Sequence, residues 1–254
     1  ITGDVLVPSF TFVASANAIV TAGATPVFCE VNYHDCNVNA DLLEDYITPN
    51  TEALMIVHYA GQCCNMDKIA AFCEKHSLVL IEDSAETIGG TYKGQKAGSW
   101  GIGCFSFFPT KNITTGEGGM FTTDDAELAN QVRTLIAHGI DKTTLERHRD
   151  GRGWTRAAIM PGFNFRLSNL LAAIGVEQMK KIDVLNQKRR RASQRLIDNL
   201  RGTGSIDLPI ENVNTGHVYQ MFTIKCREDV SRDKVVARLK DRGIEASVHF
   251  DPPV

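Results

Sequence analysis

The chain has 254 residues, of which 43% are hydrophobic and 22% charged, and its formal net charge is −3. This balance is ordinary for a globular protein with a large core, and it indicates neither a nucleic-acid nor a membrane partner. No apolar run reaches the roughly 18 residues of a membrane span, and the N-terminus lacks the pattern of a signal peptide.

The first half of the chain predicts alternating strands and helices. Strands are expected at 4–7, 25–31, 53–59 and 78–81, and helices at 9–22, 41–47 and 66–76. Continuously apolar strands such as ALMIVHY and LVLI are typical of a parallel sheet covered on both faces. The predicted fold class is therefore α/β.

The second half is less regular. We expect a hairpin turn around 93–95, strands at 103–108, 120–123, 217–226 and 244–250, and helices at 125–137, 168–200 and 232–242. The helix from Ser168 is expected to contain a break, and its basic run at 188–191 to lie on a solvated face. Residues 139–162 are predicted to form a long surface loop.

The seven cysteines are scattered through apolar segments. None of them forms a CxxC pair, so the sequence carries no zinc-site spacing. This pattern predicts reduced, buried thiols in a cytoplasmic protein, with Cys104 in the core.

Two acidic residues, Glu82 and Asp83, follow a predicted apolar strand directly. In open parallel sheets ligands bind beyond the carboxyl ends of the strands, so charged residues there are candidates for function. An acidic helix cap or a surface loop would give the same pattern.

Lys111 stands in the segment FSFFPTKNITTGEGG, between an apolar run and a glycine-rich turn. A desolvated lysine is readily neutral, and its amine is then a nucleophile toward carbonyls or the partner in a Schiff base. Nearby hydroxyls, those of Ser106, Thr110, Thr114 and Thr115, could hold a phosphate. The alternative is that Lys111 is an ordinary surface lysine between a strand and a turn.

Together, Asp83 and Lys111 suit pyridoxal 5'-phosphate (PLP). In PLP enzymes a lysine carries the cofactor, and a carboxylate keeps the pyridine nitrogen protonated, so that the ring acts as an electron sink. An ordinary salt bridge between the two residues is the alternative.

Five segments together resemble the DegT/DnrJ/EryC1/StrS aminotransferases: PSFTFVASANAI, GATPVF, IEDSAE, YKGQKAGSWGIGCFSFFPTKNITTGEGG and GFNFRLSNLLAAIGVEQ. These are fold-type I PLP enzymes, most of which aminate keto-sugars carried on nucleotides. The resemblance implies a mixed, mostly parallel sheet with flanking helices, followed by a partial α+β small domain.

The resemblance also implies a division of the chain. Residues 1–180 would form the PLP-binding large domain, and residues 181–254 a linker helix and the C-terminal small domain. Both ends lie next to predicted strands, and the hydroxyl-rich turn that binds phosphate in the family would precede Asp4. We therefore expect both domains to be truncated and the natural polypeptide to be longer.

By the same resemblance Lys111 is the Schiff-base lysine and Asp83 the partner of the pyridine nitrogen. Phe12 matches the aromatic residue that stacks on the ring, and Ser106 a phosphate-binding hydroxyl. Asn164 matches an asparagine that reaches the phosphate from the neighbouring subunit, which implies a homodimer with shared active sites. Taken alone, Phe12 would be a core residue, Ser106 a strand serine and Asn164 a turn residue.

Glu86 departs from the family pattern, which usually has Gln or His three residues after the aspartate, near the phenolic oxygen of the cofactor. A carboxylate there would have to be protonated or hydrogen-bonded through another group. We expect Glu86 to contribute to the cofactor site.

The lysine at position 111 favours amino transfer, because histidine replaces it in relatives that are sugar 3-dehydratases. The expected donor is glutamate, and the expected acceptor is a nucleotide-linked keto-sugar of the 4-keto-6-deoxyhexose type, for surface-glycan or antibiotic sugars. The loop at 138–154 either touches this substrate or is a mobile surface loop. A carbocyclic keto substrate and a non-catalytic, regulatory member of the family are the alternatives.

Overall fold

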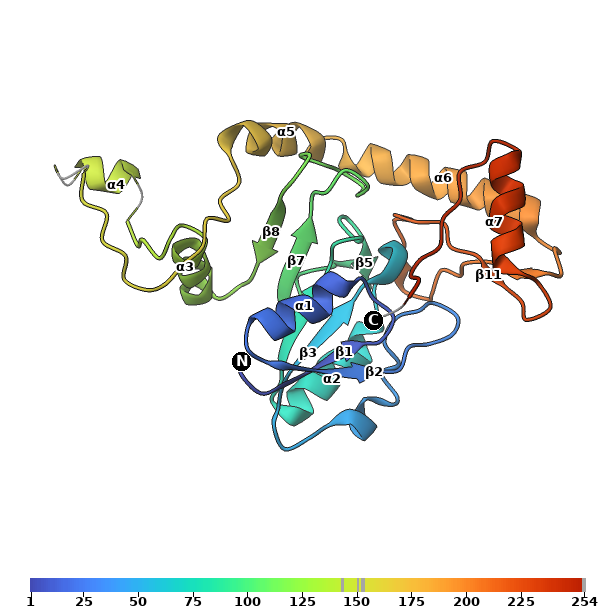
Figure 1. Ribbon diagram of the computed structural model, residues 1–254, viewed down its shortest axis with the longest axis horizontal. Coiled ribbons are helices and arrows are strands. Elements are labelled where there is room, and N and C mark those ends of the chain that lie inside the picture. The colour runs from blue at the N-terminus through green and yellow to red at the C-terminus, as the bar shows by residue number, and fades with distance from the viewer. Residues whose placement is uncertain (143, 150, 152–153, 253–254) are drawn as a thin grey trace.

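A computed structural model describes residues 1–142, 144–149, 151 and 154–252. Its centre is a six-stranded sheet with the strand order β2-β1-β3-β4-β7-β8 (Figure 1). The strands are β1 (Asp4–Pro8), β2 (Thr25–Cys29), β3 (Thr51–Val57), β4 (Val79–Asp83), β7 (Ile102–Ser106) and β8 (Gly119–Thr122). Neighbouring strands are parallel except that β8 runs antiparallel to β7. The expected α/β fold with a mixed, mostly parallel sheet is present.

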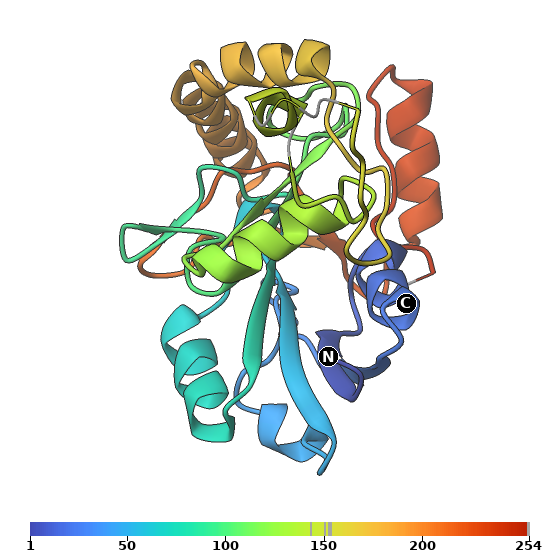
Figure 2. The same cartoon turned by 90° about the vertical axis from the view of Figure 1, so that its left-hand side faces the viewer.

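Helices cover both faces of this sheet, as its apolar strands require. On one face Val5 and Val7 of β1 cluster with Ile19 of α1 (Val13–Thr21). On the other face Leu6 clusters with Ile69 of α2 (Met66–His76). Figure 2 shows α1 and α2 on opposite sides of the sheet. Alternate residues of one strand therefore belong to two different cores.

The helices of the second half begin at capping side chains. The Asp125 carboxylate caps α3 (Ala126–Leu135), and the Ser168 hydroxyl accepts from Leu171 N at the start of α5 (Asn169–Met179). The chain turns at 180–181 into α6 (Ile182–Leu200), which confirms the expected break; Figure 1 shows α5 and α6 nearly end to end. The division into two domains near residue 180 stays a prediction.

Short elements complete the described chain. A hairpin joins β5 (Thr91–Tyr92) and β6 (Gln95–Lys96) through Lys93 and Gly94, whose φ angles are 49° and 82°. The others are η1 (Leu43–Tyr46), η2 (Tyr59–Gly61), α4 (Thr144–Arg149), β9 (Ile206–Asp207), β10 (Thr215–Gly216), β11 (Lys225–Cys226) and α7 (Arg232–Asp241). β10 pairs with β5 and β11 with β9.

Two predicted strands are wrong. Residues 217–226 contribute only β11, because the backbone of Val218 and Met221 bonds to the turn at 60–61 instead of to a strand. Residues 244–250 are not a strand; Phe250 packs instead edge-on against Phe10, with ring centroids 5.4 Å apart. Apolar composition indicated strands there, but tertiary contacts decided the backbone, and Ile244 is 51% exposed.

Other expectations are corrected in detail. Glu82 and Asp83 are the last residues of β4 and do not follow it. The predicted loop at 139–162 contains α4, and 143, 150 and 152–153 within it lie outside the described residues. Cys104 is exposed and not in the core. Of the basic run at 188–191, Arg189 and Arg190 donate to backbone carbonyls of 217–220, while the run is otherwise exposed as expected.

Within the described part of the chain, every helix is too short or too polar to cross a bilayer.

His217 makes stability depend on pH. Its burial lowers the pKa to about 4 from an ordinary 6.5, although the Gly61 carbonyl and Glu211 favour the charged form. The Nδ1 atom of His217 accepts a hydrogen bond from Tyr219 N at 3.1 Å, which requires the neutral ring. His217 binds a proton more readily in the unfolded chain than in the folded one. The contribution of the neutral ring to the free energy of unfolding is therefore complete above about pH 6.5 and is lost as the pH falls toward 4.

We predict that His217→Gln flattens this loss. The free energy of unfolding, measured by urea denaturation from pH 7 to 4, should fall less steeply with falling pH than in the unsubstituted chain, by up to about 1.4 kcal/mol per pH unit. The exposed His148, changed to Gln, serves as the control and should leave the slope unchanged. An unaltered slope in His217→Gln contradicts the role of this ring.

Candidate functional site

The sequence-predicted residues gather at the carboxyl edge of the parallel strands. The register places Val57, Asp83 and Cys104 level on β3, β4 and β7. The loops that leave this edge carry Phe12 after β1, Glu86 after β4 and Lys111 after β7. This is the edge at which open parallel sheets bind ligands.

Asp83 points toward the face covered by α1. Ser15 of α1 donates its hydroxyl hydrogen to Asp83 Oδ2 at 2.8 Å, and Ala85 N donates to Oδ1 at 3.1 Å. Each carboxylate oxygen thus has a donor from the protein. Since an ionised carboxylate offers about four acceptor positions, others remain for a ligand.

Glu82 points to the opposite face and is fully buried. Its carboxylate accepts from the backbone N–H groups of Gly98, Trp100 and Gly101 at 2.7–2.9 Å. Burial raises the pKa of Glu82, but these hydrogen bonds and one to His58 outweigh it and hold the pKa below its ordinary value. Glu82 is therefore a structural acid, whereas Asp83 is available to a ligand.

His58 completes this buried cluster. Its Nδ1 accepts from Cys64 N at 3.1 Å, so the hydrogen of a neutral ring lies on Nε2, which is 3.0 Å from Glu82 Oε2. The ring donates to the carboxylate in this tautomer. His58 N also donates to the carbonyl of Asp83, which ties β3 to the end of β4.

Lys111 pairs with Glu86. The two side chains are 17% and 11% exposed, and Lys111 Nζ lies 3.5 Å from Glu86 Oε1. Glu86 Oε2 accepts from Ala60 N at 2.8 Å, so the acid is held from the side of β3. The Lys111 side chain is thus largely buried, and its neighbouring carboxylate belongs to the residue that departs from the family pattern.

The loop that carries Lys111 is fixed by its own backbone. Thr115 N and Thr114 Oγ1 both donate to the carbonyl of Phe107, and Thr115 Oγ1 donates to that of Glu117. These two hydroxyls, expected as phosphate ligands, are thus engaged by carbonyl groups. Ser106 Oγ accepts from Phe108 N at 3.3 Å, and its hydroxyl hydrogen can still be donated.

Gly118 is required for this turn. Its φ angle is 147°, and a Cβ atom there would lie 2.8 Å from both Leu167 and Thr115. The glycine-rich pattern after Lys111 therefore reflects a backbone constraint of the loop.

Asn186 of α6 connects the loops of Lys111 and Glu86. Its Oδ1 accepts from Asn112 Nδ2 at 2.7 Å, and its Nδ2 donates to the carbonyl of Ile88 at 3.0 Å. The Asn112 and Asn186 side chains and the Ile88 carbonyl lie beside the apolar cluster that contains Ile113 and Ile182. The helix predicted as a linker thus also sets the spacing of the site.

Phe12 is 62% exposed and occupies the N-cap position of α1 without a side-chain capping bond. Without the family resemblance Phe12 would be expected in the core, and the structure does not place it there. Ser, Thr, Asp and Asn are preferred at the N-cap position, so a phenylalanine there makes the helix less stable by roughly 1 kcal/mol. A residue that is poor for the local structure is typical of a functional site.

Asn164 lies away from the carboxyl edge. It forms an isolated bridge with Ala137 beyond α3, and its side-chain oxygen accepts from Arg166 Nε at 3.0 Å. The side chain is exposed. Within one chain Asn164 is not brought to Lys111, so its expected role depends on a second subunit and stays a prediction.

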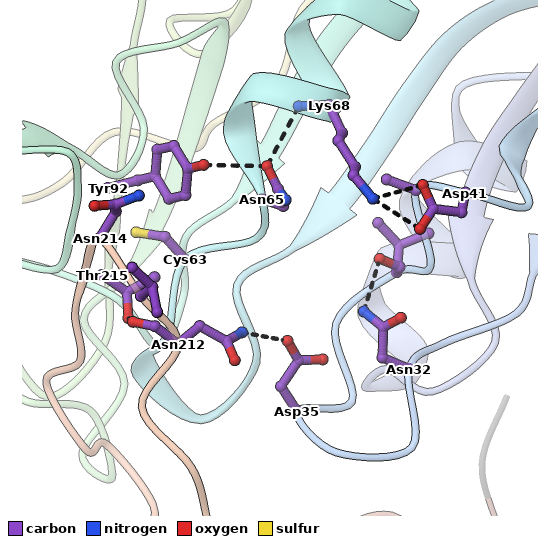
Figure 3. A pocket seen from close by; sticks show the side chains of 13 residues that line it. Asn32, Asp35, Asp41, Cys63, Asn65, Lys68, Tyr92, Asn212, Asn214 and Thr215 are labelled. Atoms are coloured by element: carbon purple, nitrogen blue, oxygen red, sulfur yellow. Dashed lines mark hydrogen bonds and ion pairs between the residues drawn. The ribbon is translucent and has the colours of Figure 1, made fainter.

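A separate polar cavity of about 390 Å³ lies between the segment 32–41, the start of α2 and the segment 212–215 (Figure 3). Its charges are already satisfied: Lys68 Nζ binds both oxygens of Asp41, and Asn212 Nδ2 donates to Asp35. Of the six sequence-predicted residues, all of which the structure describes, none lines this cavity. It offers no reactive arrangement.

Sequence reasoning missed three residues of the site. Thr11 and Ser15 stand in the segment quoted for the resemblance, and their spacing of four on the start of a helix could have paired them. Asn186 gave no such signal, because a polar residue on a long charged helix is ordinarily exposed.

The chain is similar to known proteins along nearly its whole length. Residues 2–254 match the DegT/DnrJ/EryC1/StrS aminotransferase family. GDP-perosamine synthase of Caulobacter vibrioides is 40% identical over 253 residues, which are 98% of this chain and 66% of that protein. The chain spans 65–66% of the length of the curated relatives that head the comparison.

Solved structures match throughout the chain. That of S. venezuelae DesV in complex with a ketimine intermediate has a TM-score of 0.91 and 31% identity, covering 99% of this chain and 64% of DesV. The PLP form of the putative sugar aminotransferase Spr1654 of Streptococcus pneumoniae has a TM-score of 0.89 and 27% identity, with coverage of 99% and 68%. The fold is thus that of fold-type I PLP aminotransferases, as expected.

The Glu82 cluster yields a prediction about stability. Glu82→Ala leaves the N–H groups of Gly98, Trp100 and Gly101 without their acceptor and His58 without its partner, so the free energy of unfolding should fall by about 3–5 kcal/mol. Glu74→Ala, at an exposed position of α2, should change it by less than about 0.5 kcal/mol. Urea denaturation measures both, and a loss below about 1 kcal/mol in Glu82→Ala contradicts the cluster's role.

Proposed function

This chain belongs to the DegT/DnrJ/EryC1/StrS aminotransferase family, and we propose that it is a PLP-dependent aminotransferase for a nucleotide-linked keto-sugar. The observation that carries this proposal is the carboxyl edge of the sheet. There a largely buried lysine, Lys111, and a carboxylate held by two donors, Asp83, follow neighbouring strands.

The chemistry of the side chains at this edge fits PLP. Lys111 supplies a primary amine for the aldehyde, and Asp83 an acceptor for the ring N–H. Phe12 offers an exposed aromatic ring for the face of the pyridine, and Ser106 a hydroxyl for the phosphate. No two of these residues compete for the same part of the cofactor.

When bound, PLP supplies an electron sink for the bonding electrons at the carbon that carries the amino group. Lys111 holds the cofactor through Nζ and, when that amine is free, moves the proton at this carbon. Asp83 keeps a proton on the ring nitrogen by accepting its hydrogen bond.

Glu86 orients the lysine. Its carboxylate lies between Lys111 Nζ and Ala60 N, at 3.5 Å and 2.8 Å. Ala60 N thus supplies the hydrogen bond from another group that a carboxylate at this position needs. We place Glu86 beside the reacting amine.

The acceptor substrate is proposed to carry a nucleotide diphosphate. One relative is named a GDP-perosamine synthase, and another matched structure is described with its TDP-sugar product. Arg133, Arg156 and Arg166 line an open cavity of about 770 Å³ together with Asp141 and Glu146, and the three arginines suit a diphosphate. Because Arg166 contacts Asn164, away from Lys111 of the same chain, this cavity would serve the active site of a second subunit. Glutamate is the proposed donor, and surface-glycan or antibiotic sugars are the proposed products.

The active site is proposed to be shared in a homodimer. Leu170, Ile174 and Val176 of α5 are 80%, 47% and 59% exposed, and Phe165 just before the helix is 69% exposed. Apolar side chains gathered in this way are typical of a protein–protein interface. Asn164 lies beside this surface, from which it would reach the phosphate bound by the second subunit.

Free thiols support a cytoplasmic location. All seven cysteines lie in the described part of the chain and none is in a disulfide, as is usual where thiols are kept reduced.

The function is tested with the protein, PLP and glutamate against a panel of nucleotide-linked 4-keto and 3-keto sugars and carbocyclic ketones. We predict that 2-oxoglutarate and one amino sugar form in equal amounts. Lys111→Ala should lower the rate roughly 10³-fold or more, because it removes both the attachment point and the proton carrier.

Lys96→Ala, at an exposed position of β6, is the control and should keep the full rate. Amination of a carbocyclic ketone alone would shift the assignment to that substrate class. Cofactor binding without product from any acceptor would favour a non-catalytic member of the family.

A further inference from the structure

Two buried hydroxyl groups at the start of α1 form a chain that ends on Asp83. Ser15 Oγ lies 2.8 Å from Asp83 Oδ2, and Thr11 Oγ1 lies 2.8 Å from Ser15 Oγ. Thr11 is 1% and Ser15 4% exposed, so bulk water does not compete for these bonds.

The direction of this chain follows from the number of hydrogens. A serine hydroxyl has one hydrogen, and an ionised carboxylate can only accept. Ser15 therefore donates to Asp83, and its oxygen is left to accept from Thr11. Both bonds point toward the carboxylate, and hydrogen bonds aligned in this way strengthen one another.

The chain also joins Asp83 to the segment that carries Phe12. Thr11 precedes the N-cap residue Phe12, and Ser15 N donates to the carbonyl of Phe12 at 3.1 Å. A shift of the α1 start would therefore move the aromatic ring and the support of the carboxylate together. Ala85 N holds the other carboxylate oxygen, so Asp83 is fixed from both sides.

We propose that Thr11 and Ser15 are positioning residues, which hold the Asp83 carboxylate as the hydrogen-bond acceptor for the ring nitrogen of the cofactor. The inference rests on the proposed function, because it takes Asp83 as the partner of that nitrogen. It assigns a role to two residues that do not touch the substrate.

The test compares two ligands: PLP, and its analogue in which a C–H group replaces the ring nitrogen. Dissociation constants are measured by absorbance titration on the full chain, without substrate. The unsubstituted protein should prefer PLP, and Asp83→Asn should remove that preference. Ser15→Ala should reduce the preference about tenfold, as expected for one hydrogen bond to a charged group.

Thr11 provides a matched pair of variants. Thr11→Val keeps the shape but lacks the hydroxyl and should reduce the preference about threefold, whereas Thr11→Ser keeps the hydroxyl and should retain it. Because Thr11 acts through Ser15, the double variant Thr11→Val/Ser15→Ala should lose no more than Ser15→Ala alone. Thr21→Ala, at an exposed position of α1, should leave both constants unchanged.

An equal loss for both ligands in Ser15→Ala would overturn the proposal, since a packing defect does not distinguish nitrogen from carbon. If Ser15→Ala binds both ligands as tightly as the unsubstituted protein does, the proposal is overturned as well, while the cofactor assignment stays intact. If the unsubstituted chain binds neither ligand, the proposed function fails and this inference fails with it.

Discussion

The buried carboxylate of Glu82 is the constraint on which the rest of the site depends. Four donors meet it: His58 and the backbone N–H groups of Gly98, Trp100 and Gly101. These bonds lock the end of β4 to β3 and to the loop before β7. Because neighbouring residues of a strand face opposite ways, fixing Glu82 on the α2 face presents Asp83 on the α1 face.

The remaining parts of the site are spaced by elements far away in the sequence. Asn186 of α6 holds the loops that carry Lys111 and Glu86, and Gln220 donates to the carbonyl of Thr110 at 3.0 Å. α1 brings Ser15 to Asp83 from the other face. The lysine, its neighbouring acid and the aspartate are thus positioned by three separate anchors on a rigid sheet, as preorganised sites require.

Much of this arrangement could be predicted from the sequence, because apolar strands and helix caps are local signals. The parallel arrangement of β1, β3 and β4, the hairpin at 93–94 and the placement of Asp83 and Lys111 after apolar strands follow from such signals. The path of residues 217–226 does not, since Val218 and Met221 bond to a turn at 60–61 that no local pattern reveals. The contact of Asn186 with Asn112 is likewise set by packing over 74 positions.

The whole arrangement requires that Lys111 be the residue that holds the cofactor. The most direct measurement is borohydride reduction of the protein after incubation with PLP, followed by proteolysis and mass spectrometry of the peptides. We predict a pyridoxyl group on Lys111 and none anywhere in Lys111→Arg. Modification of a different lysine, with Lys111 left unmodified, would contradict it.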